Sequence, residues 1–95
     1  MRRTFTATMP PQAQSQVPPV HVVLSDVVAQ LAIVAHAYLE PQPEGAEPDF
    51  ASAEVAIDVA GQTFERIQAR LPSEERSALA RMLTELRMTF VRKRG

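Results

Sequence analysis

The first segment of the chain with regularly spaced apolar residues covers residues 22–39. Between residues 22 and 39 they return every three or four positions, which places them on one face of an α-helix. This stripe consists of Leu24, Val27, Leu31, Val34 and Tyr38. Additional valine, isoleucine and leucine residues widen it until little polar surface remains, so we expect this helix to be buried on more than one side.

Two other structures fit the same segment. Residues 20–39 are long enough to span a bilayer, but Asp26 lies inside the segment, and an aspartate at the centre of a membrane helix costs about 2.5 to 3.5 kcal/mol. Residues 20–24 are rich in β-branched side chains, which favour a strand, but the chain contains no partner strand for them. We therefore predict a helix that does not enter a membrane.

A second and more regular stripe follows after Asp49, which is the expected N-cap of a helix over residues 50–70. Its members alternate spacings of three and four over three heptads. They are Phe50, Ala53, Ile57, Ala60, Phe64, Ile67 and Leu71. Gly61 costs about 1 kcal/mol relative to alanine inside a helix, so we expect another helix to approach closely at Ala53, Ala56, Ala60 and Gly61. A ligand in contact with Gly61 is the alternative.

The third helix is predicted over residues 74–92. Pro72 ends the preceding helix, Ser73 is the expected N-cap, and Glu74 and Glu75 follow where the helix dipole favours anions. The expected apolar face comprises Leu79, Met82, Leu83, Leu86, Phe90 and Val91. The fold class is therefore all-α, with three amphipathic helices arranged as a helical hairpin plus one.

Two segments lack apolar periodicity. Residues 1–19 contain four prolines with several threonines and glutamines, so we expect a disordered tail before a single three-helix domain over residues 20–95. This tail lacks the apolar run of a signal peptide. Residues 41–48 contain three prolines and a glycine, which predicts an irregular loop. The loop is acidic, and it is either a solvated connector or a docking strip for a basic partner.

The size of the domain favours association. Ordering about 75 residues costs roughly 1.5 kcal/mol each, and one core of this size leaves a surplus of only a few kcal/mol. The chain has no cysteine, so disulfides and thiolate metal sites are excluded. We therefore expect a homo-oligomer, with a dimer favoured, or a protein partner. The predicted interface comprises Leu24, Val27, Leu31, Val34, Tyr38, Ala53, Ile57, Ala60, Gly61 and Phe64.

Charge is segregated although the net charge is only −1. Every charged residue from Glu40 to Asp58 is acidic, whereas the C-terminal end is basic. A basic contact surface is predicted at Arg87, Arg92, Lys93 and Arg94. It would touch RNA or an acidic protein surface, and the alternative is a solvated helix end that complements the dipole. Asp58 and Arg87 form a hypothetical structural ion pair between the second and third helices.

The chain carries no pattern that predicts catalysis. His21 and His36 lie about 22 Å apart along one helix, so they cannot share a metal ion. His36 and Glu40 have the spacing of two ligands but lack a third. No nucleophile accompanies the carboxylates, and no glycine-rich phosphate loop is present. We expect no cofactor, no metal and no enzymatic activity.

Several motifs resemble those of a known family. Residues 22–91 are similar to the bacterial family called domain of unknown function 1844. The similarity is carried by Asp49-Phe50-Ala51-Ser52-Ala53 before Ile57-Asp58, by Leu71-Pro72-Ser73-Glu74-Glu75, and by Leu83-Thr84-Glu85-Leu86-Arg87 before Phe90-Val91. The chain departs from the family at Ala69-Arg70, where members often have glycine-asparagine, and at Glu40, where they often have glycine. The resemblance implies a small helical bacterial protein with no assigned activity.

These observations together predict a non-enzymatic structural or interaction module of the cytoplasm. It would self-associate or bind a protein partner. The alternative is an accessory factor that contacts RNA or a ribonucleoprotein through the basic C-terminal helix.

Overall fold

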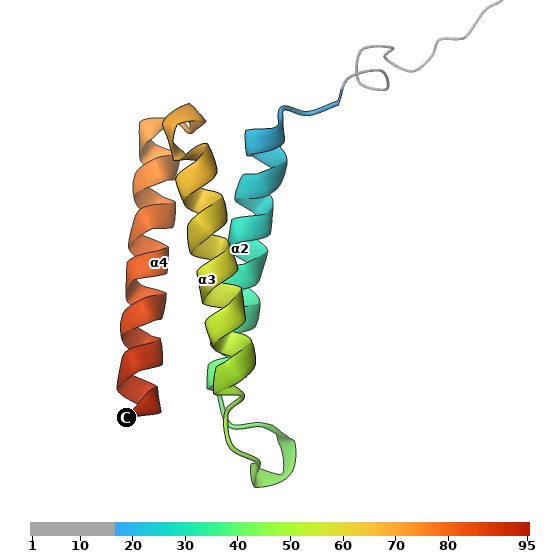
Figure 1. The fold of residues 1–95 in the computed structure, drawn as a ribbon, viewed down its shortest axis with the longest axis vertical. Coiled ribbons are helices and arrows are strands. Elements are labelled where there is room, and N and C mark those ends of the chain that lie inside the picture. Colours follow the sequence, from blue (N-terminus) through green and yellow to red (C-terminus); the bar gives the residue numbers. More distant parts are fainter. Residues whose placement is uncertain (1–16) are drawn as a thin grey trace, which may run out of the picture.

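A computed structural model describes residues 17–95 of the chain, and Figure 1 shows their arrangement. The predicted tail lies mostly outside the described residues, because these begin at Val17. The described part consists of three α-helices, α2 (Val20–Leu39), α3 (Phe50–Ile67) and α4 (Ser73–Arg94), with two short 3₁₀ turns, η1 (Pro43–Gly45) and η2 (Gln68–Arg70). No strand occurs within residues 17–95, so the all-α prediction is confirmed and the strand alternative for residues 20–24 is wrong.

The helix boundaries follow the predicted ones closely. The N-cap at Asp49 is confirmed, because its carboxylate accepts hydrogen bonds from the Ser52 N–H at 3.0 Å and the Ser52 hydroxyl at 2.7 Å. These two bonds hold the pKa of Asp49 below its usual value. The N-cap prediction at Ser73 is wrong, since α4 starts one residue earlier than expected and Pro72 occupies the cap position without a side-chain bond.

The helices form an antiparallel hairpin of α2 and α3, and α4 returns along both of them (Figure 1). A backbone hydrogen bond of 2.9 Å from the Asp49 N–H to the Tyr38 carbonyl joins the end of α2 to the start of α3. This bond fixes where the two helices stand relative to each other along their length. Residues 40–49 therefore lie at one end of the hairpin, together with the C-terminus of α4 (Figure 1).

The α3 helix supplies most of the core, as its regular stripe predicts. Its residues Ala53, Ile57, Ala60, Phe64 and Ile67 are buried, as is Leu71 after the helix. Ala56 and Gly61 are also buried. At Gly61 the neighbouring group is the Arg87 side chain and not the backbone of another helix, so the close helix approach predicted at this residue is wrong. On α4 the leucines at 79, 83 and 86 are buried. Val91 was expected on the same face but is 67% exposed, because it lies at the edge of the junction between α3 and α4.

The α2 helix buries a different stripe from the one that its largest side chains predict. Its buried residues are Ser25, Val28, Ala32, Ala35 and Leu39, each one position after a member of the predicted stripe. The predicted stripe is only half-buried, and its member Val34 is 40% exposed. Three of these five residues are small, which lets α2 approach the alanines of α3 closely, and Val28 and Leu39 are fully buried beside them. Ser25 is satisfied there, since its hydroxyl donates to the Val22 carbonyl at 2.9 Å.

By length and composition, α2 is the one helix among the described residues that could cross a membrane. This property is weak evidence, because the core helix of a soluble protein meets the same criterion. In the fold, α2 contacts both α3 and α4 through its buried stripe.

Candidate protein-interaction surface

Two open depressions lie along the junction of α2 and α3, one near each end, and we call the two together the α2–α3 groove. Its first half, near the loop, measures about 420 Å³ and is lined by Leu31, Val34, Tyr38, Ala51, Ser52, Val55 and Ala56. Its second half, near the start of α2, measures about 450 Å³ and is lined by Val20, His21, Leu24, Thr63, Arg66, Ile67 and Arg70. The lining residues of both halves come from α2, α3 and the turn after α3, and α4 contributes none.

Helix periodicity explains the groove. Buried residues of α2 define its core side, and the stripe one position earlier points about 100° away, toward the edge of the hairpin. On α3, Ser52, Val55, Val59, Thr63 and Arg66 repeat at spacings of three and four beside the core stripe. The two flanking stripes face the same side of the hairpin and form the two walls of the groove.

The loop half of the groove is apolar and accessible. Val55 is 62% exposed and Val34 is 40% exposed, whereas Leu31 and Tyr38 pack partly against the core. The polar groups in its wall are the hydroxyls of Ser52 and Tyr38, and the Ser52 hydroxyl is already bonded to Asp49. This half of the groove carries no charged side chain in its lining.

The other half of the groove is mixed. Arg66 and Arg70 are exposed there beside the apolar side chains of Val20 and Leu24. Nδ1 of His21 is buried and has no hydrogen-bond partner among the described residues. This half therefore combines positive charge with apolar surface.

The predicted interface is divided by the fold. Its α2 members Leu31, Val34 and Tyr38 line the loop half of the groove, and Leu24 lines the other half. Val27 is half-buried on the same stripe. The predicted members on α3 lie instead in the core of the single chain, where no partner reaches them: these are Ala53, Ile57, Ala60, Gly61 and Phe64. Those five predicted contacts are corrected to core positions, because α2 and α4 already cover them.

Sequence reasoning missed the valines of α3 that do line or border the groove. Val55 and Val59 are 62% and 43% exposed, although valine has no polar group to place in water. Their signal was present in the sequence as apolar residues at positions 55 and 59, outside the heptad stripe of that helix. An apolar residue off the core stripe of an amphipathic helix is a candidate for a second contact.

Asp58 and Arg87 lie near each other but do not form the predicted ion pair. Both line a small depression of about 200 Å³ between α3 and α4, together with Glu54, Ile57, Phe90 and Val91. Among residues 17–95 the single ion pair within 4.0 Å joins Lys93 and Glu40. The Arg87 guanidinium lies instead against the α carbon position of Gly61, in the space that a β carbon would fill.

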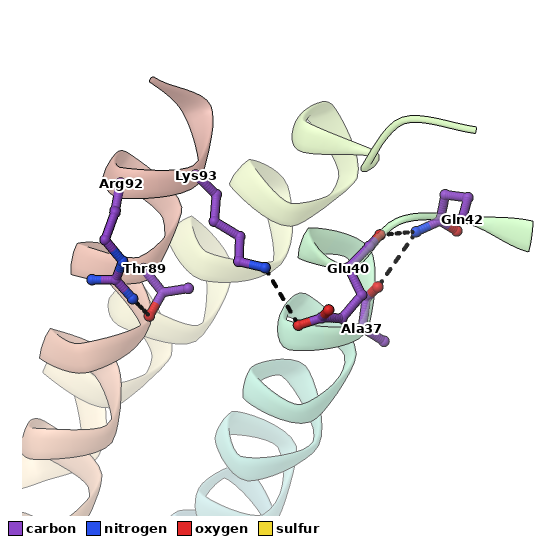
Figure 2. A network of polar contacts seen from close by, with 6 residues as sticks. All are labelled: Ala37, Glu40, Gln42, Thr89, Arg92 and Lys93. Atoms are coloured by element: carbon purple, nitrogen blue, oxygen red, sulfur yellow. Dashed lines mark hydrogen bonds and ion pairs between the residues drawn. The ribbon is translucent and has the colours of Figure 1, made fainter. Parts of the chain in front are cut away.

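The basic end of α4 is engaged within the chain. Lys93 Nζ lies 3.6 Å from Glu40 Oε2, and the Arg92 guanidinium donates to Thr89 Oγ1 at 3.3 Å (Figure 2). The Arg94 guanidinium stands 5.5 Å from the centre of the Phe90 ring. Figure 2 also shows Gln42, whose amide donates to the Glu40 carbonyl at 2.8 Å and so holds the start of the loop against the end of α2.

The described residues contain no group of three histidine, cysteine, aspartate or glutamate side chains that could hold a metal ion. The acidic residues of α3 are exposed, and His36 is exposed near the end of α2.

Comparison with known proteins gives one result. No curated protein matches the chain, and no solved structure matches it. One family model matches residues 21–92, and its description is "Domain of unknown function (DUF1844)". This range includes all of α3 and nearly all of α2 and α4, so the match spans the three helices that form the core. The chain belongs to the DUF1844 family.

Proposed function

We propose that this chain is a non-enzymatic interaction module of the cytoplasm, and that the α2–α3 groove is the surface that a protein helix covers. The observation that carries the proposal is the apolar loop half of the groove, where Val34 and Val55 stand exposed with no charge in the lining. Large apolar surfaces bordered by polar residues are typical of protein contacts.

The energetics favour a covering partner. Full burial of a valine or leucine side chain is worth about 1.5 to 3 kcal/mol, and a half-exposed one forgoes about half of that. Three exposed valines line or border the groove, Val34, Val55 and Val59. Three partly buried aliphatic side chains lie beside them: Leu24, Val27 and Leu31. A helix laid along the groove would gain from all of them, which is the mode in which amphipathic helices bind apolar grooves.

RNA contact through the C-terminal helix is less well supported. Its three terminal basic residues already have partners within the chain, and the acidic loop lies beside them. From Glu40 to Asp58 six acidic residues gather toward this end, against four basic residues from Arg87 onward. The phosphate backbone needs a surplus of positive charge, and this end of the molecule has none.

A site-specific crosslink tests the proposal. A photoreactive phenylalanine analogue replaces Val55 in one variant and Val91 in a matched control, since both valines are well exposed and lie on different faces. We expect irradiation in cells to attach protein to position 55 and to leave position 91 largely unmodified. If position 55 captures no protein, or if both positions capture the same set, the groove is not a specific protein contact and the proposal fails.

A further inference from the structure

We infer that the occupant of the α2–α3 groove is a second copy of this chain, packed antiparallel across a two-fold axis. The inference rests on the proposed function, which makes the groove a protein contact, and it adds the identity and direction of the partner. Two observations carry it: the distribution of charge along the groove and the size of the face that contains it.

Charge is distributed unequally along the α2–α3 groove. At one end Arg66 and Arg70 line the groove, and the described α2 residues beside them are uncharged apart from the ring of His21. At the other end the hairpin closes through a loop that carries four acidic residues: Glu40, Glu44, Glu47 and Asp49. Because α3 runs from Phe50 to Ile67, its positive end and the acidic loop are separated by the whole length of the helix.

A second copy complements this charge distribution if its helices run in the opposite direction. A two-fold axis that lies in the interface and crosses α3 at right angles near Val59 places the arginines of one copy opposite the acidic loop of the other. The same contact forms twice, once at each end of the face. A parallel arrangement would place arginines against arginines and acidic loops against each other, and like charges across an interface oppose binding.

The same rotation also matches the apolar stripes. It places α3 opposite α3 and α2 opposite α2, so Val55 meets the partner near its Thr63 and Leu24 meets the partner near its Val34. Both stripes continue through the centre as Val27 on α2 and Val59 on α3, which are half-buried and 43% exposed in the single chain. The centre of such an interface would be apolar and its ends charged, as in most stable contacts.

The face has the area that a stable dimer needs. A helix of 20 residues is about 30 Å long, and two adjacent helices are together about 20 Å wide, so the α2–α3 face projects over roughly 600 Å². Side-chain relief enlarges this figure toward the ~800 Å² that each partner buries in a typical specific interface. A single helix from another protein would fill the groove itself but would leave the flanking parts of this face uncovered.

Sedimentation velocity on the full chain at micromolar concentration tests the second copy. We expect the unaltered chain to sediment as a dimer, and Val55→Glu to raise the dissociation constant at least about tenfold by burying a charge in the apolar centre. Val91→Glu on α4 is the matched control and should leave the dimer intact, because Val91 is exposed and lies outside the α2–α3 groove. Far-ultraviolet circular dichroism should show equal helix content in all three proteins, because both substitutions fall at exposed positions.

Charge reversal tests the direction of packing. Arg66→Glu with Arg70→Glu, and separately Glu44→Lys with Glu47→Lys, should each weaken the homodimer at least about tenfold. A mixture of the two variants should form a heterodimer nearly as stable as the original, since reversed charges meet at one end and original charges at the other. If mixing restores nothing, the antiparallel arrangement is wrong.

The outcomes separate the two proposals. If the chain is monomeric and position 55 crosslinks another protein, the second copy is excluded while the groove remains a protein contact. If the chain is monomeric and position 55 captures no protein, both proposals fail. A monomer that binds lipid vesicles through the Val55 face, or one whose own N-terminal residues crosslink to position 55, would likewise overturn the second copy.

Discussion

At Gly61 a side chain of α4, that of Arg87, lies close to the backbone of α3. A β carbon at this position would collide with the Arg87 guanidinium, and with nothing else nearby. That group is the far end of a long flexible side chain at an exposed position, so it is free to rotate away. The structure therefore places the Arg87 guanidinium, and not the backbone of another helix, in the space beside Gly61.

We expect Gly61→Ala to raise the free energy of unfolding by about 0.5 to 1 kcal/mol, because alanine favours a helix interior over glycine by that amount. Urea denaturation checks the sign. The same substitution in an Arg87→Ala background should give an equal or larger gain, since no guanidinium then has to move. A loss of stability in both backgrounds would show that the backbone at position 61 tolerates no side chain.

Asp49 and Ser73 show what a residue type alone predicts about helix starts. Both are good N-cap residues before a helix, and only Asp49 makes the capping bond. Ser73 fails because Pro72 precedes it in an extended conformation, and the Pro72 carbonyl accepts the N–H of Arg76 at 2.8 Å, which starts the helix one residue earlier. The sequence predicts that a helix starts near such a residue, and the backbone geometry of its neighbours decides which residue is the N-cap.

Replacing Asp49 with alanine should lower the melting temperature by a few degrees at neutral pH, because the Ser52 N–H loses its acceptor. The pKa of Asp49 is lowered in the folded chain, so its carboxylate stabilises the fold above its ordinary pKa of 3.8. That contribution disappears as the pH falls through the lowered pKa. Thermal melts from pH 7 down to pH 2.5 should therefore converge for the two proteins, with Asp49→Asn lying between them at pH 7.

At the scale of elements, the three helices differ in how strongly their sequences specify a buried face. The α3 stripe has one clear apolar side, and every predicted member from Ala53 to Leu71 is buried. The α2 helix is apolar nearly all round, so periodicity predicts a helix without fixing its rotation. Side-chain size favoured the leucine stripe, whereas close packing against α3 selected the neighbouring stripe, which combines a serine and two alanines with Val28 and Leu39.

The α4 helix is held to the hairpin by a few large side chains. Leu79, Leu83 and Leu86 are its buried residues, and Phe90 adds an edge-to-face contact with Phe50 whose ring centres lie 6.1 Å apart. The Lys93–Glu40 ion pair at its end is exposed, and exposed pairs contribute little. The docking of α4 therefore depends mainly on the three leucines.

Leu86→Ala should lower the free energy of unfolding by about 2 to 5 kcal/mol, since Leu86 is fully buried and its loss leaves a cavity. Chemical denaturation measures the change. If the variant is too unstable to give a folded baseline, Leu86→Met should still be measurable, with a loss below about 1.5 kcal/mol. Val91→Ala on the exposed side serves as the control and should change the free energy by less than about 0.5 kcal/mol.

At the scale of the whole molecule, the sequence predicted an excess of apolar surface and the structure locates it. The predicted leucine stripe of α2 became one wall of the groove, but the other wall was missed because Val55 and Val59 lie outside the stripe of α3. Their position beside α2 depends on the rotation of α2, which periodicity leaves open. The sequence therefore predicts that the helices carry an apolar contact surface, but it does not predict which residues of α2 and α3 form that surface.

If two copies associate through the groove, folding and association are linked. The melting temperature of the unaltered chain should then rise with protein concentration, because mass action favours the dimer. That of Val55→Glu should rise less over the same range, because its dimer is weaker. Calorimetry over a hundredfold range of concentration measures both, and equal behaviour of the two proteins would contradict the linkage.

The serine and alanines on the core side of α2 make the fold sensitive to substitutions that enlarge a side chain. Most protein interiors suffer when a side chain is shortened, yet Ala32 and Ala35 are buried with almost nothing left to remove. Any larger residue there would wedge α2 away from α3 and widen the hairpin from within. Substitutions at Ala32 and Ala35 should therefore be restricted to glycine and serine, because only side chains of this size leave α2 and α3 in contact.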